Sequence, residues 1–139
     1  MPYSSRASIY FLSVGSVILG LHCFIRPREE YPRFGLPLEF APRTPKALAT
    51  SDSEDQGRVS PLMHLKGIRE ATYGLALGAL QCQGNDAAVT TLMGVISLAG
   101  LGDGIIVWFH AGDEMKHKAF GHVGAFVFLG GWSLWRALA

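Results

Sequence analysis

Residues 90–110 read TTLMGVISLAGLGDGIIVWFH, and this stretch decides the fold class. Its only formally charged residue at neutral pH is Asp103, and its length matches the roughly 20 residues that a membrane-spanning helix needs. A carboxylate in such a helix costs a few kcal/mol unless it is paired, so it is normally kept for a reason. The stretch therefore predicts a membrane helix whose carboxylate has either a partner or a task.

The rest of the chain repeats this apolar character. Of its 139 residues, 49% are hydrophobic, and most of the charges lie between Arg26 and Arg58 or between Asp113 and Lys118. Four segments are apolar and close to spanning length, at about 7–24, 65–82, 87–110 and 120–138. We expect an all-α integral membrane four-helix bundle that forms a single domain over residues 1–139.

One long connection separates the first two segments. Within it, residues 41–61 include TSDSEDQG, which cannot bury apolar surface, so we expect a flexible loop there. The preceding RFGLPLEF, residues 33–40, alternates apolar residues with others. This piece either lies on the membrane surface or folds back over the helix ends.

The first segment has the N-terminal position and preceding Arg6 of a secretory signal peptide. Its long apolar run and the absence of a small-x-small cleavage site favour an uncleaved span. Lys and Arg are concentrated in the two charged loops, which places those loops in the cytosol and both termini across the membrane. We expect residence in the endoplasmic reticulum.

Composition argues against several function classes. A net charge of +1 gives no basic field for nucleic acid. Cys23 and Cys82 lie in or beside apolar segments, so reduced thiols are expected there, although a disulfide stays open. No metal-type cysteine spacing, nucleotide-binding loop or nucleophile motif is present, so we expect neither a metal nor a cofactor.

The expected topology gathers ionisable side chains in the cytosolic half of the bundle. Lys66, Arg69, Glu70 and Tyr73 have the i, i+3, i+4, i+7 spacing of one helix face. Asp103 lies beside Gly100, Gly102 and Gly104, which permit close helix approach or leave room for a ligand. His22, His110, which is seven residues after Asp103, and His122 lie at similar depth.

Each of these residues also has a structural interpretation. Asp103 can pair with Arg69 to join two helices, and Lys66 can extend to the membrane surface. His110 can cap its helix, Tyr73 and His122 can be core residues, and Trp108 can anchor at the interface. The set as a whole exceeds what one structural ion pair requires, which is typical of a functional pocket in a membrane protein.

At HLKGIREATYGLALGAL, GDGIIVWFHAG and KAFGHVGAF the sequence resembles a family of small four-span membrane proteins, largely a domain of unknown function, found in fungi and bacteria. The likeness also includes RFGLPLE and covers most of the chain except TPKALATSDSEDQG. Its motif positions are Lys66, Arg69, Glu70, Asp103, Lys118 and His122. Members lie in fungal secondary-metabolite gene clusters, and the resemblance implies a link to hydrolytic opening of polyketide epoxides.

Epoxide opening needs a base to activate water or an internal hydroxyl, and an acid to protonate the leaving oxygen. We expect Asp103 to be the base, oriented by Arg69, with Glu70 or His110 as the acid. Lys66, Tyr73, His122 and Trp108 are the expected substrate-binding residues. The substrate would be a lipophilic polyketide or terpenoid. The alternatives are a small solute or proton carrier and a non-catalytic membrane scaffold, with membrane lipid, a second copy or pathway enzymes as partners.

Overall fold

The computed structural model describes residues 3–39 and 57–138, and within these ranges the fold is all-α, as the sequence predicts. The four apolar segments each lie within one long helix. In chain order the elements are α1 (Tyr3–Ile25), α2 (Pro27–Phe34), α3 (Pro61–Cys82), α4 (Asp86–His110), α5 (Gly112–Met115), the 3-10 helix η2 (Lys116–Lys118) and α6 (Ala119–Leu138).

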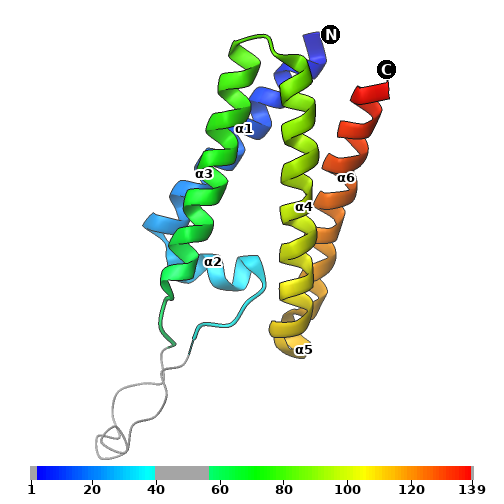
Figure 1. The fold of residues 1–139 in the computed structure, drawn as a ribbon. Coiled ribbons are helices and arrows are strands. Elements are labelled where there is room, and N and C mark those ends of the chain that lie inside the picture. Colours follow the sequence, from blue (N-terminus) through cyan, green and yellow to red (C-terminus); the bar gives the residue numbers. More distant parts are fainter. Residues whose placement is uncertain (1–2, 40–56, 139) are drawn as a thin grey trace, which may run out of the picture.

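The four long helices pack as two pairs (Figure 1). One pair is α1 with α3, the other is α4 with α6, and contacts between α3 and α4 are much sparser. A short turn joins α3 to α4 at the end where both termini lie, and the two helices diverge from that turn. At the opposite end, called here the α2 end, α2 lies between the diverging pairs.

Small residues bring α1 and α3 into backbone contact. A Cβ atom built on Gly74 would lie 2.5 Å from the Ser13 carbonyl oxygen, and one on Gly20 would lie 2.6 Å from the Gly67 carbonyl oxygen. The hydroxyl of Ser13 also donates a 2.7 Å hydrogen bond to the Gly74 carbonyl. In a bilayer the hydrophobic effect does not drive helices together, and close packing through small residues such as glycine commonly takes its place.

The glycines around Asp103 divide between two roles. Gly104 packs against Val123 of α6, and Gly100 faces the backbone of α6, where its Cβ would lie 3.2 Å from the His122 carbonyl oxygen. Gly102 has open space beside its Cα, so it makes no such approach. Gly100 and Gly104 therefore make the expected close helix approach, whereas Gly102 has the open space that was the other expectation.

A short helix occupies part of the connection that the sequence left without helical structure. Pro27 lies in the first turn of α2, and Gly35 ends the helix in a left-handed conformation with φ of 104°. Tyr31 packs in a cluster with Cys23 and Met63 of the first pair, whereas Phe34 packs with α4 and α6 residues such as Val107. Thus α2 is a wedge that contacts both helix pairs.

The chain after α2 folds back over the helix ends as far as the structure describes it. Leu36 and Leu38 pack against the cluster around Tyr31. The backbones of Glu39 and Arg58 then pair through two hydrogen bonds of 3.2 and 2.6 Å. Ser60 caps the start of α3 by accepting from the Leu62 amide. The flexible loop expected at 41–61 lies outside the described residues up to 56.

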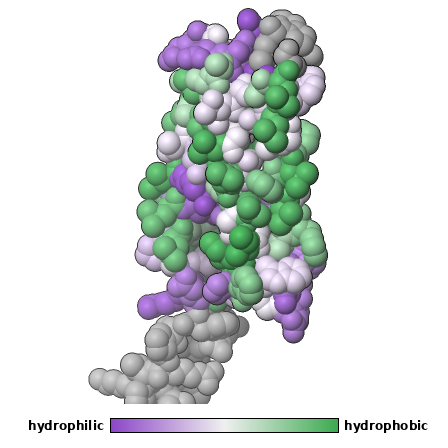
Figure 2. All heavy atoms as spheres, turned by 45° about the vertical axis from the view of Figure 1, so that its right-hand side comes forward, coloured by the Kyte–Doolittle hydropathy of each residue, from purple (hydrophilic) through white to green (hydrophobic). Residues whose placement is uncertain are grey.

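The surface is unusually apolar. Large exposed hydrophobic side chains come from all four long helices, for example Phe11, Leu75, Phe109 and Phe128. Figure 2 shows mainly hydrophobic residues around the middle of the visible face, with one hydrophilic patch among them, and hydrophilic residues at its two ends. Two helical stretches, Arg6–Ile25 and Asp86–His110, are long and apolar enough to cross a membrane, whereas α3 and α6 are not among the candidates. These features suggest that the protein associates with a membrane.

Candidate functional site

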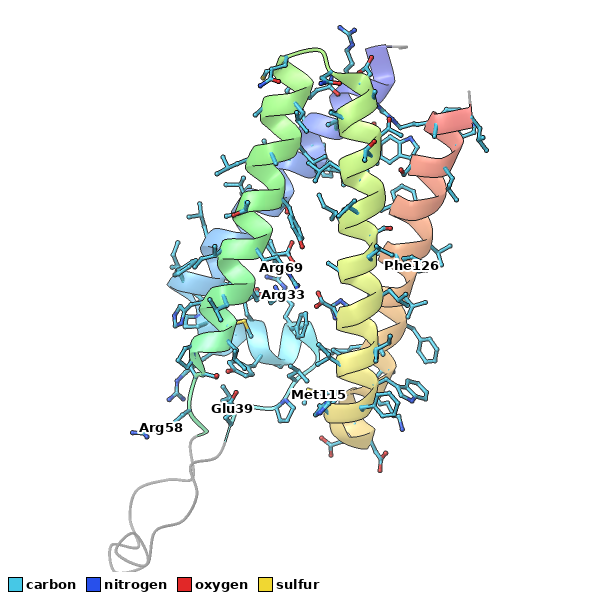
Figure 3. All side chains as sticks on the ribbon, viewed as in Figure 1. Arg33, Glu39, Arg58, Arg69, Met115 and Phe126 are labelled. Carbon is cyan, nitrogen blue, oxygen red and sulfur yellow. The ribbon has the colours of Figure 1, made fainter. Side chains whose placement is uncertain are left out.

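A cavity of about 250 Å³ lies between the two helix pairs at the α2 end. Side chains from five helices line it, so it exists only where both pairs and the wedge meet. Its polar lining comprises Glu30 and Arg33 of α2, Lys66, Glu70 and Tyr73 of α3, Ser97 and Asp103 of α4, and His122 of α6. Figure 3 shows Arg33 and Arg69 pointing into the space between α3 and α4 from different elements.

The strongest polar contact at this site joins the two helix pairs. Arg69 of α3 donates two hydrogen bonds to Asp103 of α4, from Nη2 to Oδ2 at 2.6 Å and from Nη1 to Oδ1 at 3.1 Å. The Asp103 side chain is 11% exposed and that of Arg69 32%. A two-pronged pair of this kind fixes the plane of the carboxylate as well as its position.

The same guanidinium also holds a second carboxylate. Nη2 of Arg69 lies 3.3 Å from Oε1 of Glu70, whose other oxygen accepts from the Ser16 hydroxyl at 3.4 Å. Ser16 also donates to the Glu70 backbone carbonyl at 2.9 Å, which keeps α1 against α3 at this level. Two carboxylates therefore share one cation at the cavity, in unequal environments.

Glu30 is a third carboxylate at the cavity, and it is not among the residues that the sequence singled out. Its side chain is 1% exposed, and Oε1 accepts from Nδ1 of His22 at 2.6 Å and from Arg33 at 3.2 Å. Its other oxygen lies 3.8 Å from Nζ of Lys66. Lys66 is thereby turned inward, with its side chain 11% exposed, and does not extend to the surface.

Further contacts fix α2 to the second helix pair. Nε2 of His122 donates to the Phe34 carbonyl at 2.8 Å, since a carbonyl oxygen can only accept. The Phe34 ring lies edge-on to the His122 ring, with centroids 4.7 Å apart, and Nζ of Lys66 lies 5.2 Å from its centre. Lys118 donates to the Pro32 carbonyl. His122 thus lines the cavity and also anchors the wedge.

The structure brings together most of the residues that the sequence singled out. Lys66, Glu70, Tyr73, Asp103 and His122 line the cavity, and Arg69 holds two of its carboxylates. The convergence expected from helix spacing is therefore present for these six side chains.

Two expected site residues lie elsewhere. His110 is exposed, its Nδ1 donates back to the Ile106 carbonyl of its own helix at 3.0 Å, and it does not line this cavity. Trp108 is 42% exposed, with its ring 5.7 Å from that of Phe120 and 4.6 Å from Nζ of Lys116. It lies on the outer surface, as an interface anchor would, and does not line the cavity.

Two cavity residues that were not predicted, Glu30 and Arg33, lie in a segment that carries the sequence signals of a helix. In PREEYPRFG a proline begins the first turn, glutamates follow, an arginine ends the last turn and a glycine comes next. Those are the start and stop signals of a helix. The helix was not predicted because Pro32 lies inside the segment and because the segment is only eight residues long.

The Glu30 contacts yield a stability prediction. Glu30→Gln should lower the free energy of unfolding by about 1–3 kcal/mol, because the partners of a buried carboxylate lose a charged acceptor. The matched control is Glu29→Gln, whose side chain is 59% exposed and whose loss should stay within about 0.5 kcal/mol. Thermal unfolding in detergent measures both, and equal effects would show that Glu30 does not hold α2 in place.

Within residues 3–39 and 57–138, no group of three His, Cys, Asp or Glu side chains is placed to hold a metal ion. What the cavity offers instead is proton chemistry. It combines carboxylates with different partners and an imidazole whose Nε2 donates a hydrogen bond, the groups that general acid–base catalysis uses.

Comparison with known proteins finds one match. A family model described as a domain of unknown function, DUF4267, matches residues 13–136. That span includes every residue that lines the cavity. No curated protein and no solved structure matches the chain.

Proposed function

Since the chain belongs to the DUF4267 family of unknown function, we propose an activity from its cavity: it is a membrane-embedded epoxide hydrolase or epoxide-opening cyclase. The substrate is a lipophilic polyketide or terpenoid intermediate of fungal secondary metabolism. The observation that carries the proposal is the Arg69–Asp103–Glu70 arrangement, in which one guanidinium holds two carboxylates at a cavity between apolar helices.

The proposal places all four long helices across a membrane, although α3 and α6 are not among the helices that are apolar enough by composition. In α3, Lys66, Arg69 and Glu70 lower the average hydropathy.

 

The charged side chains that lower this average point inward: Lys66 and Glu70 are 11% and 17% exposed and have partners in the cavity. The outward face of α3 carries Leu65, Ile68 and Leu75, each more than half exposed. In α6, Phe120, Val127, Phe128 and Leu134 are likewise exposed. An average over all residues counts inward charges as if they faced lipid, so it understates how well these helices suit a bilayer.

In this arrangement both charged connections lie on the cytosolic side, in accord with the excess of Lys and Arg there. The cavity then opens in the cytosolic half of the membrane, in the endoplasmic reticulum on our proposal. A substrate that partitions into lipid reaches such a cavity without leaving the bilayer.

The proposed reaction divides two proton transfers between the two carboxylates. Asp103, held in place by Arg69, takes a proton from water or from a hydroxyl of the substrate as that oxygen bonds to an epoxide carbon. The carbon–oxygen bond of the ring breaks, and Glu70 in its protonated form gives its proton to the released oxygen. Exchange with water then returns Glu70 and Asp103 to their starting states, and the product is a diol or a cyclic ether alcohol.

Lys66, Tyr73 and His122 complete the proposed site. The Tyr73 hydroxyl and the Lys66 ammonium can donate hydrogen bonds to substrate oxygens, and His122 is held in one orientation by Phe34. With His110 outside the cavity, Glu70 is the remaining acid of the original pair of candidates.

Deletion of the gene in its source organism tests the function. Lipophilic metabolites of the deletion strain and its parent are compared by mass spectrometry. We expect an epoxide to accumulate and a product heavier by one water, or isomeric with the epoxide, to disappear. An unchanged profile would contradict the enzyme proposal and favour a scaffold or a carrier.

The membrane arrangement gives a second prediction. The protein should stay in the membrane fraction after an alkaline carbonate wash, and tags at its two ends should both be protected from protease added to sealed microsomes. A tag inserted between residues 40 and 56 should be cleaved under the same conditions. Release by the wash, or opposite protection of the two ends, would contradict four spans.

A further inference from the structure

A second cavity, of about 360 Å³, lies between α3 and α4 at the α2 end. It is lined mainly by apolar side chains of α2, α3, α4 and the chain that follows α2. The diverging course of α3 and α4 creates it, because these helices make few contacts below their connecting turn. We call it the outer chamber, and the 250 Å³ cavity the inner chamber.

The two chambers adjoin at Asp103. Phe34, Lys66 and Asp103 line both, whereas Arg69 lines only the outer chamber and Glu70 only the inner one. The Arg69–Asp103 pair therefore stands at the boundary. A molecule whose reactive group reaches Asp103 from the outer chamber passes beside the Arg69 guanidinium.

The rim of the outer chamber is exposed and apolar. Leu62 and Leu65 of α3 are 65% and 59% exposed, and Ile106 of α4 is 48% exposed. Each of these side chains lines the chamber and also belongs to the apolar outer surface. The chamber is thus continuous with the surface that would face lipid acyl chains.

A larger groove between α1 and α6, of about 1030 Å³, lacks this connection. Phe11, Phe128 and Trp135 are among its lining residues, and none of its lining side chains is ionisable. None of the carboxylates of the inner chamber lines this groove, so the groove does not bring a ligand to them.

We propose that the outer chamber is the binding site for the alkyl or polyene chain of the substrate, and that the substrate enters sideways from the bilayer between α3 and α4. This inference rests on the proposed function. The ligand it selects is a long-chain amphiphile with a neutral oxygen function at one end. That oxygen lies at Asp103, and the chain extends past Leu65 and Ile106 into lipid.

Photolabelling of the full chain in phosphatidylcholine nanodiscs tests this site without requiring turnover. The probe is octadecanol with a diazirine in its chain, and labelled peptides are located by mass spectrometry. We expect labelling concentrated at Leu62, Leu65 and Ile106, and reduced by excess unlabelled octadecanol. Labelling spread evenly over lipid-facing positions, unaffected by competitor, would overturn the proposal.

A variant with a larger side chain in the outer chamber tests whether the alkyl chain binds there. Ile106→Trp should reduce competed labelling by about tenfold, which corresponds to expelling about two methylene groups from the site. The control is Leu75→Trp, at a 65% exposed position of α3 that does not line the chamber, and its labelling should be unchanged. Equal labelling in the two variants would contradict a bound chain in the outer chamber.

A second arm, turnover of a long-chain terminal epoxide, separates this inference from the proposed function. Site-specific labelling without turnover supports the chain site and overturns the proposed chemistry. Turnover that is the same in wild type and Ile106→Trp, with evenly spread labelling, keeps the chemistry and overturns the entry route.

Discussion

Asp103→Asn is expected to lower turnover of the accumulated epoxide by about 10²–10⁴-fold, the usual contribution of a positioned general base. The amide keeps the shape of the side chain and can still accept one hydrogen bond from Arg69, but it cannot take a proton. In the deletion strain this variant should therefore fail to clear the epoxide that wild type clears. Mass spectrometry of the complemented strains measures the difference.

A structural role for the same carboxylate makes a different prediction. Replacing a buried ion pair by apolar side chains of similar volume often preserves folding, whereas removing one partner strands the other charge. The double variant Arg69→Met with Asp103→Leu should therefore fold and remain inactive if Asp103 is the base. If this variant restores the wild-type metabolite profile, the pair only joins the helices.

The matched control for the single variant is Asp113→Asn. Asp113 is exposed in α5 and lies outside both chambers, so the same chemical change there should leave turnover and folding unaffected. Loss of activity in this control would mean that the assay responds to net charge or expression, and the result for Asp103 would then lose its meaning.

Gly74→Ala is expected to lower the free energy of unfolding by about 1–3 kcal/mol, because its added methyl group overpacks a close contact. The new Cβ would lie 2.5 Å from the Ser13 carbonyl oxygen and 2.7 Å from a methyl of Val17. Both atoms belong to α1, so α1 and α3 must move apart. Thermal unfolding in detergent, followed by circular dichroism, measures the change.

The control for this variant is Gly15→Ala. Gly15 lies in α1, and a Cβ there would meet nothing within 4 Å. Alanine has the higher helix propensity, so this change should be neutral or stabilising by up to about 1 kcal/mol. Similar losses for both variants would show that the helix pair does not depend on backbone contact at Gly74.

Much of the fold could be predicted because long apolar segments are a strong signal. The segments expected at 65–82, 87–110 and 120–138 lie within one or a few residues of α3, α4 and α6. The eight-residue α2 gave no such signal, since its position depends on contacts from Tyr31 and Phe34 to residues distant in sequence. The pairing of α1 with α3 also required the small residues to be matched across two helices.

The site was predictable to the extent that one helix face determines it. Lys66, Glu70 and Tyr73 share a face of α3, and all three line the inner chamber. The same spacing rule failed between Asp103 and His110. The spacing shows that two residues lie on the same face of α4. It does not show whether another helix packs against that face at both levels. His110 is the last residue of α4, at the end where α3 and α4 have diverged.

The Arg69–Asp103 pair has a consequence for how the chain is made. Asp103 follows Arg69 by 34 residues, so Arg69 is synthesised before its partner carboxylate. In the proposed membrane arrangement, α3 would then meet lipid with two cations, Lys66 and Arg69, and only Glu70 within the helix to compensate them. We therefore expect the translocation machinery to retain α3 until α4 arrives and to release the two helices together. Synthesis of the α3–α4 hairpin would then limit the rate at which this protein is inserted into the membrane.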